Sequence, residues 1–352
     1  MSGLDEFAEA AEADYASDKL RRKNQYLTRE LGRAVANIER LEEQVDTLTA
    51  IDGVTAANAA WKTPRKKKGR HVGIANLLLS DLHLDEVVNP SEVGHSNAYN
   101  RRIAELRLRA AFEKFVMVGK DYIAGISYDG AVVAMLGDTF SGNIHEELKE
   151  TNECSILESI DHWIDPMVAG LRLVADEFGK VHVPCTPGNH GRNTRKPIHK
   201  GRARDNFDFL FMRMVARAMQ SDRRVTFDIP DAADTQMRQY GHTFHYTHGD
   251  QFKGGSGIAG IFSPLMLGDA RKRKRQQAIG APYDVLCMGH FHQYLPARGL
   301  IVNGSLKGLD EYAMNNNFGY EPAQQAFWVT TPEHGVSFSA PIVVQDRDKE
   351  GW

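Results

Sequence analysis

The sequence predicts an α/β fold in which two β-sheets form a sandwich flanked by helices, with a helical coiled-coil extension at the N-terminus. Short apolar runs that end in chemically reactive residues, helical segments between those runs, and a series of strands after residue 221 support this prediction. With 352 residues, 42% hydrophobic and 25% charged, the chain has room for one large α/β domain and an appendage.

Residues 1–50 are predicted to form a separate coiled-coil unit. From Leu20, apolar residues recur at alternating spacings of four and three over about four heptads, with Leu27 at a d position and Ile38 at an a position. In parallel coiled coils this pattern favours two strands, and a polar a residue such as Asn24 fixes the register. We therefore expect a homodimer through this helix; the alternative is a single amphipathic helix packed on the main domain.

Residues 51–70 are predicted to be a linker that becomes strongly basic between Lys62 and Arg70. Such a run is typical of a solvated, flexible segment. Alternatively, it is an arm that grips a phosphate backbone. The main domain is predicted from residue 71 to residue 345.

Five short runs in the main domain have the composition of buried strands. They are Ile74–Ser80, Ala131–Leu136, Val181–Thr186, Thr243–Thr247 and Tyr283–Met288. Helices are expected at about residues 97–124, 145–178 and 205–219, where apolar residues follow helical spacing. Further strands are expected at residues 225–229, 300–303, 326–329 and 336–339.

Each of the five runs leads into a short motif that carries Asp, Asn or His. The motifs are Asp81-Leu-His83, Gly137-Asp138, Gly188-Asn189-His190, His248-Gly249 and Gly289-His290-Phe-His292. Ligands of open α/β sheets bind beyond the carboxyl ends of the strands. We therefore expect seven potential metal-binding side chains, two Asp, one Asn and four His, to meet at one edge. The competing interpretation is a set of unrelated loop-capping residues.

This donor set combines oxygen and nitrogen without a thiolate, which suits Mn²⁺, Fe²⁺ or Zn²⁺ better than Ca²⁺ and argues against a structural cysteine-rich zinc site. Seven ligands are too many for one tetrahedral ion and suit two ions that share a carboxylate. Two ions roughly 3.5–4 Å apart can generate a hydroxide and clamp the attacking and leaving oxygens of an in-line displacement at phosphorus. The motifs therefore predict phosphoester hydrolysis with two divalent ions, Mn²⁺ first among them.

The motif set resembles that of the calcineurin-like metallophosphoesterases, whose pattern is DxH, GDxxD, GNH followed by an acid, H, and GHxH. The resemblance spans residues 81–292 and implies the αββα sandwich of that family. It also implies three roles, which fall on matching residues of this chain. The first metal would be held by Asp81, His83 and His292, and the second by Asn189, His248 and His290, with Asp138 bridging both and His190 assisting the leaving group.

The chain departs from the family pattern at two positions. Ser141 stands where GDxxD has its second acid, and Gly191 stands where an acid follows GNH. In the family these acids help to orient the catalytic histidine, so the surroundings of His190 are expected to differ. Candidates to replace the acids are Asp161, His145 and Glu147. Activity is still expected because the metal ligands are intact, but the absence of Asp-Arg-Gly and GNHE argues against a phosphoprotein substrate.

Basic clusters favour a nucleic-acid substrate. Arg192, Arg195 and Lys196 follow the GNH motif directly and are the candidate substrate-binding residues. A second run, Arg271–Arg275, is either part of the same surface or only a solvated face. In a chain of net charge −3, such clusters imply charge segregation, which a polyanion lying across the metals would explain.

The family resemblance extends to subgroups. The DNA-repair nuclease branch acts as a dimer with similar basic surfaces, and the segment from Gly137 to Leu148 resembles phage and prophage members. We therefore expect a dimeric phosphodiesterase that acts on DNA more than on RNA, in the cytoplasm of a bacterial or phage-infected cell. The alternatives are a phosphodiesterase for cyclic nucleotides or other small phosphoesters, and a nucleic-acid-binding module that has lost catalysis.

Three further features bear on this expectation. Cys154, Cys185 and Cys287 are interpreted as reduced core residues. No apolar stretch reaches the ~18 residues of a membrane span, and the acidic N-terminus lacks the layout of a signal peptide. Residues 255–260 match GxGxxG but lack the βαβ context of a dinucleotide site, so we expect a flexible loop near the metals.

Overall fold

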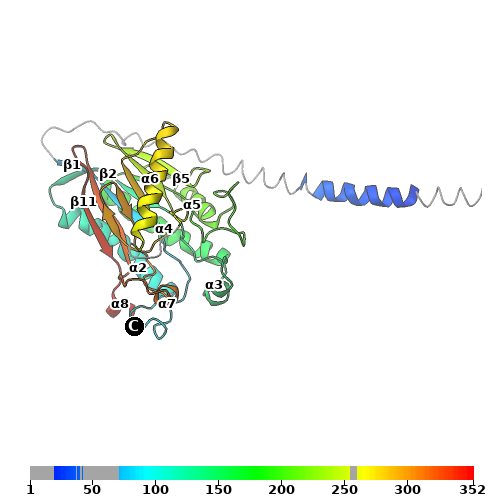
Figure 1. The fold of residues 1–352 in the computed structure, drawn as a ribbon, viewed down its shortest axis with the longest axis horizontal. Helices are drawn as coiled ribbons and strands as arrows, with labels where there is room; N and C mark the ends of the chain where they lie inside the picture. The colour runs from blue at the N-terminus through cyan, green and yellow to red at the C-terminus, as the bar shows by residue number, and fades with distance from the viewer. Residues whose placement is uncertain (1–19, 37, 40–41, 43–70, 254–259) are drawn as a thin grey trace, which may run out of the picture. The chain divides into compact units, whose positions relative to one another are not determined.

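The computed structural model describes residues 20–36, 38–39, 42, 71–253 and 260–352 (Figure 1). The chain forms two compact units, Met1–Thr55 and Ala56–Trp352, which are described separately. Within the described ranges, no helix combines the length and the hydrophobicity needed to cross a bilayer.

The first sheet contains four parallel strands and an antiparallel pair at one edge. Its order is β11-β10-β1-β2-β3-β4. The parallel strands are β1 (His71–Leu79), β2 (Ile126–Met135), β3 (Val181–Pro184) and β4 (Val225–Asp228), and the antiparallel ones are β10 (Gln324–Thr331) and β11 (Gly335–Val343). In the register, Ala75 of β1 lies opposite Ala131 of β2 and Val329 of β10. The apolar runs thus form a sheet that is buried on both faces.

The second sheet has the order β5-β6-β7-β9-β8. Its strands are β5 (Asp234–Gln239), β6 (His242–Thr247), β7 (Val285–Met288), β9 (Leu300–Val302) and β8 (Leu295–Ala297). Strands β6, β7 and β9 are parallel, and the two edge strands are antiparallel to their neighbours. The strands β5 and β8 were not expected from the sequence.

The helices agree with the sequence prediction in part. Those described are α2 (Arg101–Met117) with the π-helical η2 (Val118–Tyr122), α3 (Glu146–Thr151), α4 (Ile156–Phe178), α5 (Phe207–Ala218), α6 (Phe262–Ala278), α7 (Glu311–Asn315) and α8 (Arg347–Glu350). The single helix predicted over residues 145–178 is wrong. The chain leaves the helix at Asn152 and starts a new one at Ser155, whose hydroxyl and Glu158 form a capping box.

The two sheets pack face to face with helices outside them. Along β10, Trp328 faces the second sheet and lies 6.1 Å from the ring of Phe244, whereas the neighbouring Phe327 lies 5.9 Å from Phe115 of α2. On the outer face of the second sheet, Leu265 of α6 packs with Leu286 of β7. This alternation confirms the sandwich of two sheets between layers of helices.

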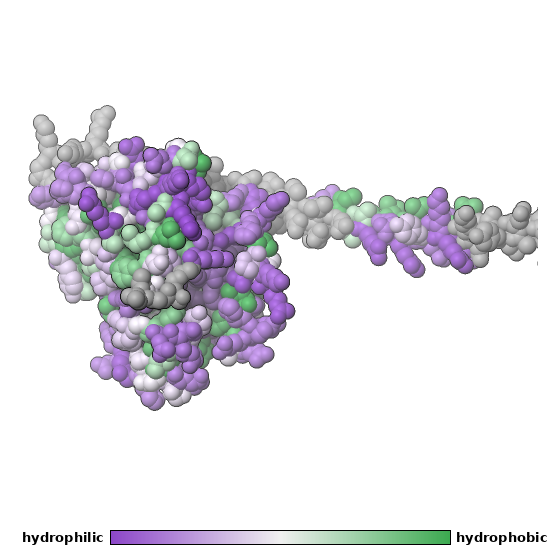
Figure 2. Space-filling model, viewed as in Figure 1, coloured by the Kyte–Doolittle hydropathy of each residue, from purple (hydrophilic) through white to green (hydrophobic). Residues whose placement is uncertain are grey.

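Residues 20–36 are helical, as the coiled-coil pattern predicts. Leu20, Leu27 and Leu31 are each more than half exposed, and Figure 2 shows hydrophobic residues along one side of this helix and hydrophilic residues along the other. The later heptad positions from residue 43 on, the basic linker 51–70 and residues 254–259 of the predicted glycine-rich loop lie outside the described residues. Pairing with a second copy stays a prediction.

The three cysteines are free, but only two lie in the core. Cys185 and Cys287 are buried, whereas Cys154 is half-buried in the segment before α4. The prediction of a core position is therefore wrong for Cys154.

Candidate metal centre

The five motifs follow strands whose carboxyl ends meet at one edge of the sandwich. Asp81 and His83 follow β1, Asp138 follows β2, and the GNH motif follows β3. The remaining histidines come from the second sheet, after β6 and β7. Because both sheets contribute, this edge gathers side chains that lie far apart in the sequence.

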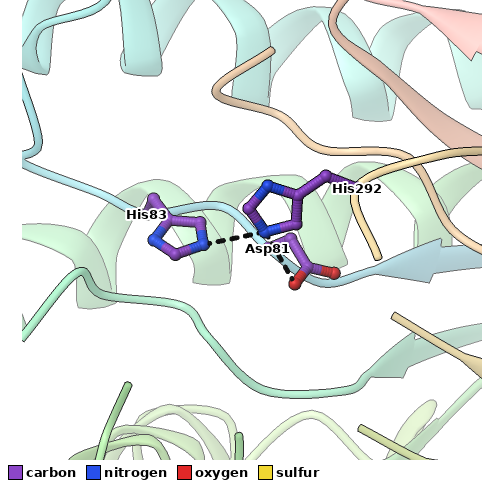
Figure 3. Close-up of side chains that lie close together, drawn as sticks. All are labelled: Asp81, His83 and His292. Atoms are coloured by element: carbon purple, nitrogen blue, oxygen red, sulfur yellow. Dashed lines mark hydrogen bonds and ion pairs between the residues drawn. The ribbon is translucent and has the colours of Figure 1, made fainter. Parts of the chain in front are cut away.

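Two groups of potential ligands form there. The first ligand group is Asp81, His83 and His292, and the second ligand group is Asp138, His248 and His290. In each group the ligand atoms all lie within 4.8 Å of one another. Nε2 of His292 lies 3.2 Å from Nε2 of His83 and 3.3 Å from Oδ1 of Asp81, and Figure 3 shows these three side chains pointing toward one another.

Asp138 and Asn189 complete the arrangement. Nε2 of His248 lies 3.0 Å from Oδ2 of Asp138 and 3.1 Å from Oδ1 of Asn189. Asp138 also forms a third cluster with His83 and His190, again within 4.8 Å. Asp138 therefore lies between the two ligand groups, as expected for a residue that bridges two ions.

Most of the candidate ligands have an unusual backbone conformation. Asp81, His83, Asp138, His290 and His292 all have positive φ angles, between 48° and 72°. Such angles are uncommon for residues other than glycine and mark functional sites. Hydrogen bonds between the loops hold this conformation; for example, the backbone nitrogen of Asp81 donates to the carbonyl oxygen of Gly137 at 3.1 Å. Glycine is required at 137, since a Cβ there would lie 2.0 Å from the backbone nitrogen of Gly188.

Backbone carbonyls determine which ring nitrogens face the centre. Nδ1 of His248 lies 2.7 Å from the carbonyl oxygen of Leu136, and Nδ1 of His190 lies 2.9 Å from that of Ser141. A carbonyl can only accept, so Nδ1 of each ring carries the hydrogen. Nε2 of His248 is then available as a ligand and Nε2 of His190 is available to a substrate.

The protonation states of the candidate ligands also favour the binding of a metal cation. Burial alone would raise the pKa of Asp138, but His248 and His190 hold it well below its usual value. Burial, with the charge of Lys307, lowers the pKa of His83 to about 4, and burial with His248 lowers the pKa of His290 to about 4. The carboxylate is thus ionised and these two rings are neutral at neutral pH, which is the state that ligates metals.

His248 has the opposite shift. Burial alone would lower its pKa, but the adjacent Asp138 raises it to about 10. In the protein without a cation, a proton on His248 therefore balances part of the buried negative charge. Bound divalent cations would displace that proton, and the residues present fit such ions.

A buried charged network, which the sequence analysis missed, supports the first ligand group. Nδ1 of His83 lies 3.1 Å from Oγ of Ser141 and 3.3 Å from Oε2 of Glu86. The Ser141 hydroxyl donates to Glu86, whose other oxygen lies 2.7 Å from Nζ of Lys307. Glu86 therefore brings a carboxylate next to the position where the family has its acid and this chain has Ser141.

A buried aspartate explains the second departure. Asp208, in the first turn of α5, accepts hydrogen bonds from the backbone nitrogens of Asp138, Thr139 and Gly188 at 2.9–3.0 Å. A Cβ at Gly191 would lie 2.7 Å from Oδ2 of Asp208. There is no room for an acid after GNH, because Asn206, whose Oδ1 would lie 2.3 Å from that Cβ, and Asp208 occupy the space.

The three predicted replacements for the missing acids fare differently. Asp161 and Glu147 are exposed on α4 and α3. The ring of His145 lies 5.7 Å from that of His190. Of the three, only His145 is found beside His190.

The predicted substrate-binding residues lie on the loop after the GNH motif. Arg192 donates from Nη1 to the carbonyl oxygen of Asn189 at 2.9 Å, so it stabilises its own loop. Arg195 and Lys196 are exposed. In the second basic run, Lys272 is buried and bound to Asp234 at 2.8 Å. Part of the basic charge seen in the sequence is thus used inside the protein.

The chain matches no family model and no curated protein. Among solved structures, Vps29 of Chaetomium thermophilum is 11% identical at a TM-score of 0.26, with 76% of this chain and 94% of Vps29 covered. The sulfate thiohydrolase SoxB of Thermus thermophilus, in complex with glycerol, is 10% identical at a TM-score of 0.29, with 79% of this chain and 58% of SoxB covered. At this level of similarity neither protein assigns a function to the chain, and the candidate centre rests on its own geometry.

Proposed function

We propose that this protein is a two-metal phosphodiesterase that hydrolyses nucleic acid, with DNA as the first candidate substrate. The observation that carries the proposal is the meeting of two ligand groups around Asp138, which is close to ligands of both. Paired sites of nitrogen and oxygen donors are typical of enzymes that displace a group at phosphorus.

The residues of the centre have distinct proposed tasks. Bound divalent ions would make a water acidic enough to attack phosphorus and would polarise the phosphoryl oxygens. Asp81, His83 and His292 would hold one ion, and Asn189, His248 and His290 the other, with Asp138 between them. With its ring protonated on both nitrogens, His190, held through Nδ1 by the carbonyl oxygen of Ser141, would donate the Nε2 proton to the leaving oxygen and remain as the neutral ring.

The exposed basic side chains after the GNH motif support a polyanionic substrate. Arg195 and Lys196 would contact the phosphate backbone while Arg192 stiffens their loop. A second candidate is a phosphodiesterase for cyclic nucleotides or other small phosphoesters. It is favoured by the internal pairing of basic residues near the centre, such as Arg202 with Asp250 at 2.6 Å.

The decisive experiment is a cleavage assay with Mn²⁺ on end-labelled single-stranded and double-stranded DNA. Asp138→Asn should lower the rate on the order of 1000-fold, because a bridging carboxylate contacts both ions. Asp161→Asn, which neutralises an exposed carboxylate of α4, is the matched control and should keep the wild-type rate. A folded wild-type protein that binds two ions but cleaves only small diesters would favour the second candidate.

We also propose that the protein is a homodimer through its N-terminal helix. The exposed leucines of residues 20–36 give that helix an apolar face that a second copy would bury. Deleting residues 1–50 should halve the mass measured by light scattering. An unchanged mass would contradict the coiled-coil dimer.

A further inference from the structure

The segment from residue 311 to residue 322 exposes an unusual number of aromatic rings. Tyr312 in α7 is 67% exposed, Phe318 is 46% exposed and Tyr320 is 57% exposed. The rings of Tyr312 and Phe318 meet edge to face at 5.8 Å. Large aromatic rings usually bury most of their surface, so a group of exposed rings on one short segment indicates a binding surface.

One of these rings, Phe318, adjoins the candidate metal centre, and Tyr312 contacts Phe318. Phe318 lines a cleft whose other side includes Phe291 and His292. His292 belongs to the first ligand group, where its Nε2 lies 3.3 Å from Asp81. A base stacked on the exposed ring of Phe318 would therefore be next to a phosphate held at the ions.

Hydrogen bonds hold the segment in place. Asp310 caps α7 by accepting from the backbone nitrogen of Ala313 at 2.7 Å, and the backbone nitrogen of Phe318 donates to Ala313 at 2.9 Å. At the far end, Glu321 accepts from the backbone nitrogen of Tyr294 at 2.8 Å. The rings thus stand on a preorganised platform, which lowers the entropy cost of binding.

The chemistry of the cleft fits a base better than a phosphate. None of the described residues that line it is Lys or Arg, and Glu321 places a carboxylate there. The side-chain amide of Gln293, which also lines the cleft, offers both a donor and an acceptor. Flat rings with a few neutral polar groups are typical of sites where unpaired bases stack.

We infer that Tyr312 and Phe318 form a stacking site for an unpaired nucleobase of the substrate strand. The inference rests on the proposed function and makes it more specific. Bases inside a duplex cover each other's faces, so a platform of this kind accepts only a single strand or an opened end. The preferred substrate is therefore single-stranded nucleic acid, with a base on the aromatic platform and the neighbouring phosphate at the ions.

Binding can be tested without catalysis. The probe is a short single-stranded oligonucleotide that carries 2-aminopurine, whose fluorescence falls on stacking, and phosphorothioate linkages that resist cleavage, mixed with the full-length protein and Mn²⁺ so that the ions stay in place. Wild-type protein should quench the probe. Tyr312→Leu and Phe318→Leu should each weaken binding about tenfold, because Leu keeps the apolar character but removes the ring.

Two variants serve as controls. Tyr312→Phe keeps the ring and should bind like the wild type. Tyr122→Leu removes a ring that is 71% exposed, but at the end of η2, just before β2 begins at Ile126. Because β2 has ten residues, that ring is roughly 30 Å from the carboxyl end of the strand, and the variant should also bind like the wild type.

Kinetics separate this inference from the proposed function. With Mn²⁺, Tyr312→Leu should raise KM for single-stranded DNA about tenfold with little change in kcat, and should leave KM for an abasic strand unchanged. Absence of quenching in the wild type, or equal quenching in the leucine variants, would overturn the stacking site even if DNA is cleaved. Ring-dependent quenching without any cleavage would keep the stacking site and overturn the nuclease.

Discussion

The two ligand groups of the candidate centre are supported in different ways. Behind the first group stand ionised side chains, since His83 contacts Glu86 and Glu86 pairs with Lys307. Behind the second group stands mostly main chain, since His248 is held by the carbonyl oxygen of Leu136. Asp208 extends that support by binding three backbone N–H groups of the loops.

Because the two groups are supported differently, we expect changes behind them to affect different properties, stability in one case and metal affinity in the other. Main-chain support is part of the loop conformation, so losing it should cost stability first. Side-chain support can be changed while the loops keep their course, so losing it should cost metal affinity first. Glu86 contacts Ser141 and Asp208 lies beside Gly191, so a carboxylate from elsewhere in the sequence lies near each of the two positions that lack an acid.

The largest expected effect is a loss of stability when the backbone of the loops loses its contacts with Asp208. Asp208→Ala should lower the free energy of unfolding by about 3 kcal/mol, because it leaves three buried N–H groups without an acceptor. Urea denaturation measures the change. Asp231→Asn, which breaks the exposed ion pair with Arg204, is the control and should cost far less because solvent screens that pair. Similar losses in both variants would contradict a special role for Asp208.

The next largest expected effect is a loss of metal affinity when the Glu86 side chain that supports His83 is changed. Glu86→Gln keeps the size of the side chain and leaves Lys307 paired with Asp310 at 2.5 Å, so the fold should persist. Calorimetric titration with Mn²⁺ should show one of two sites weakened by roughly 10- to 100-fold, because His83 loses the carboxylate that orients it.

Two comparisons sharpen this test. Glu147→Gln changes an exposed glutamate of α3 and should leave both affinities unchanged. The double variant Glu86→Gln/Lys307→Met should not restore the affinity for Mn²⁺, because removing the buried lysine does not return the carboxylate that supports His83. Equal weakening of both sites would show that Glu86 acts on the whole centre.

The meeting of the seven candidate ligands at one edge could be predicted from the sequence because each is encoded locally. Every one follows an apolar strand, and the carboxyl ends of such strands meet at one edge. The break between α3 and α4 was also readable in principle, since Ser155 and Glu158 have the spacing of a capping box. Only the segment after the break has a marked apolar face, since no residue of α3 is buried.

The elements that were missed lack an apolar pattern. Buried positions of α6 include Lys272 and Gln276, so the helix has no hydrophobic face to detect. In β5 the side-chain amide nitrogen of the buried Gln239 donates to Asn76 of β1 at 2.7 Å. Although Glu86 lies only three residues after His83, its contact with Ser141 spans 55 residues, and Asp208 binds the backbone nitrogen of Asp138 across 70 residues, so neither role could be assigned. Their roles come from tertiary contacts that no local motif encodes.

The smallest effect tests a buried ion pair outside the two ligand groups. Lys272 and Asp234 pair at 2.8 Å in the second sheet and its covering helix, much as Lys307 and Glu86 pair beside His83. Burial alone would raise the pKa of Asp234, but His245 and Lys272 hold it well below its usual value. Because the folded pKa lies below the unfolded value, the pair's stabilisation is present above about pH 4 and is lost as the pH falls through the folded value.

Between pH 5 and pH 2 the wild type should therefore lose about 1–2 kcal/mol more stability than Asp234→Asn, which has no carboxyl group to protonate. Urea denaturation at each pH measures this difference. At neutral pH the same variant should leave both Mn²⁺ affinities unchanged, because the side chains that hold Asp234, such as Thr247 of β6 and Lys272 of α6, belong to neither ligand group. A loss of affinity as large as that of Glu86→Gln would mean that buried charge anywhere in the sandwich affects the ions, and the contrast between the two kinds of support would no longer hold.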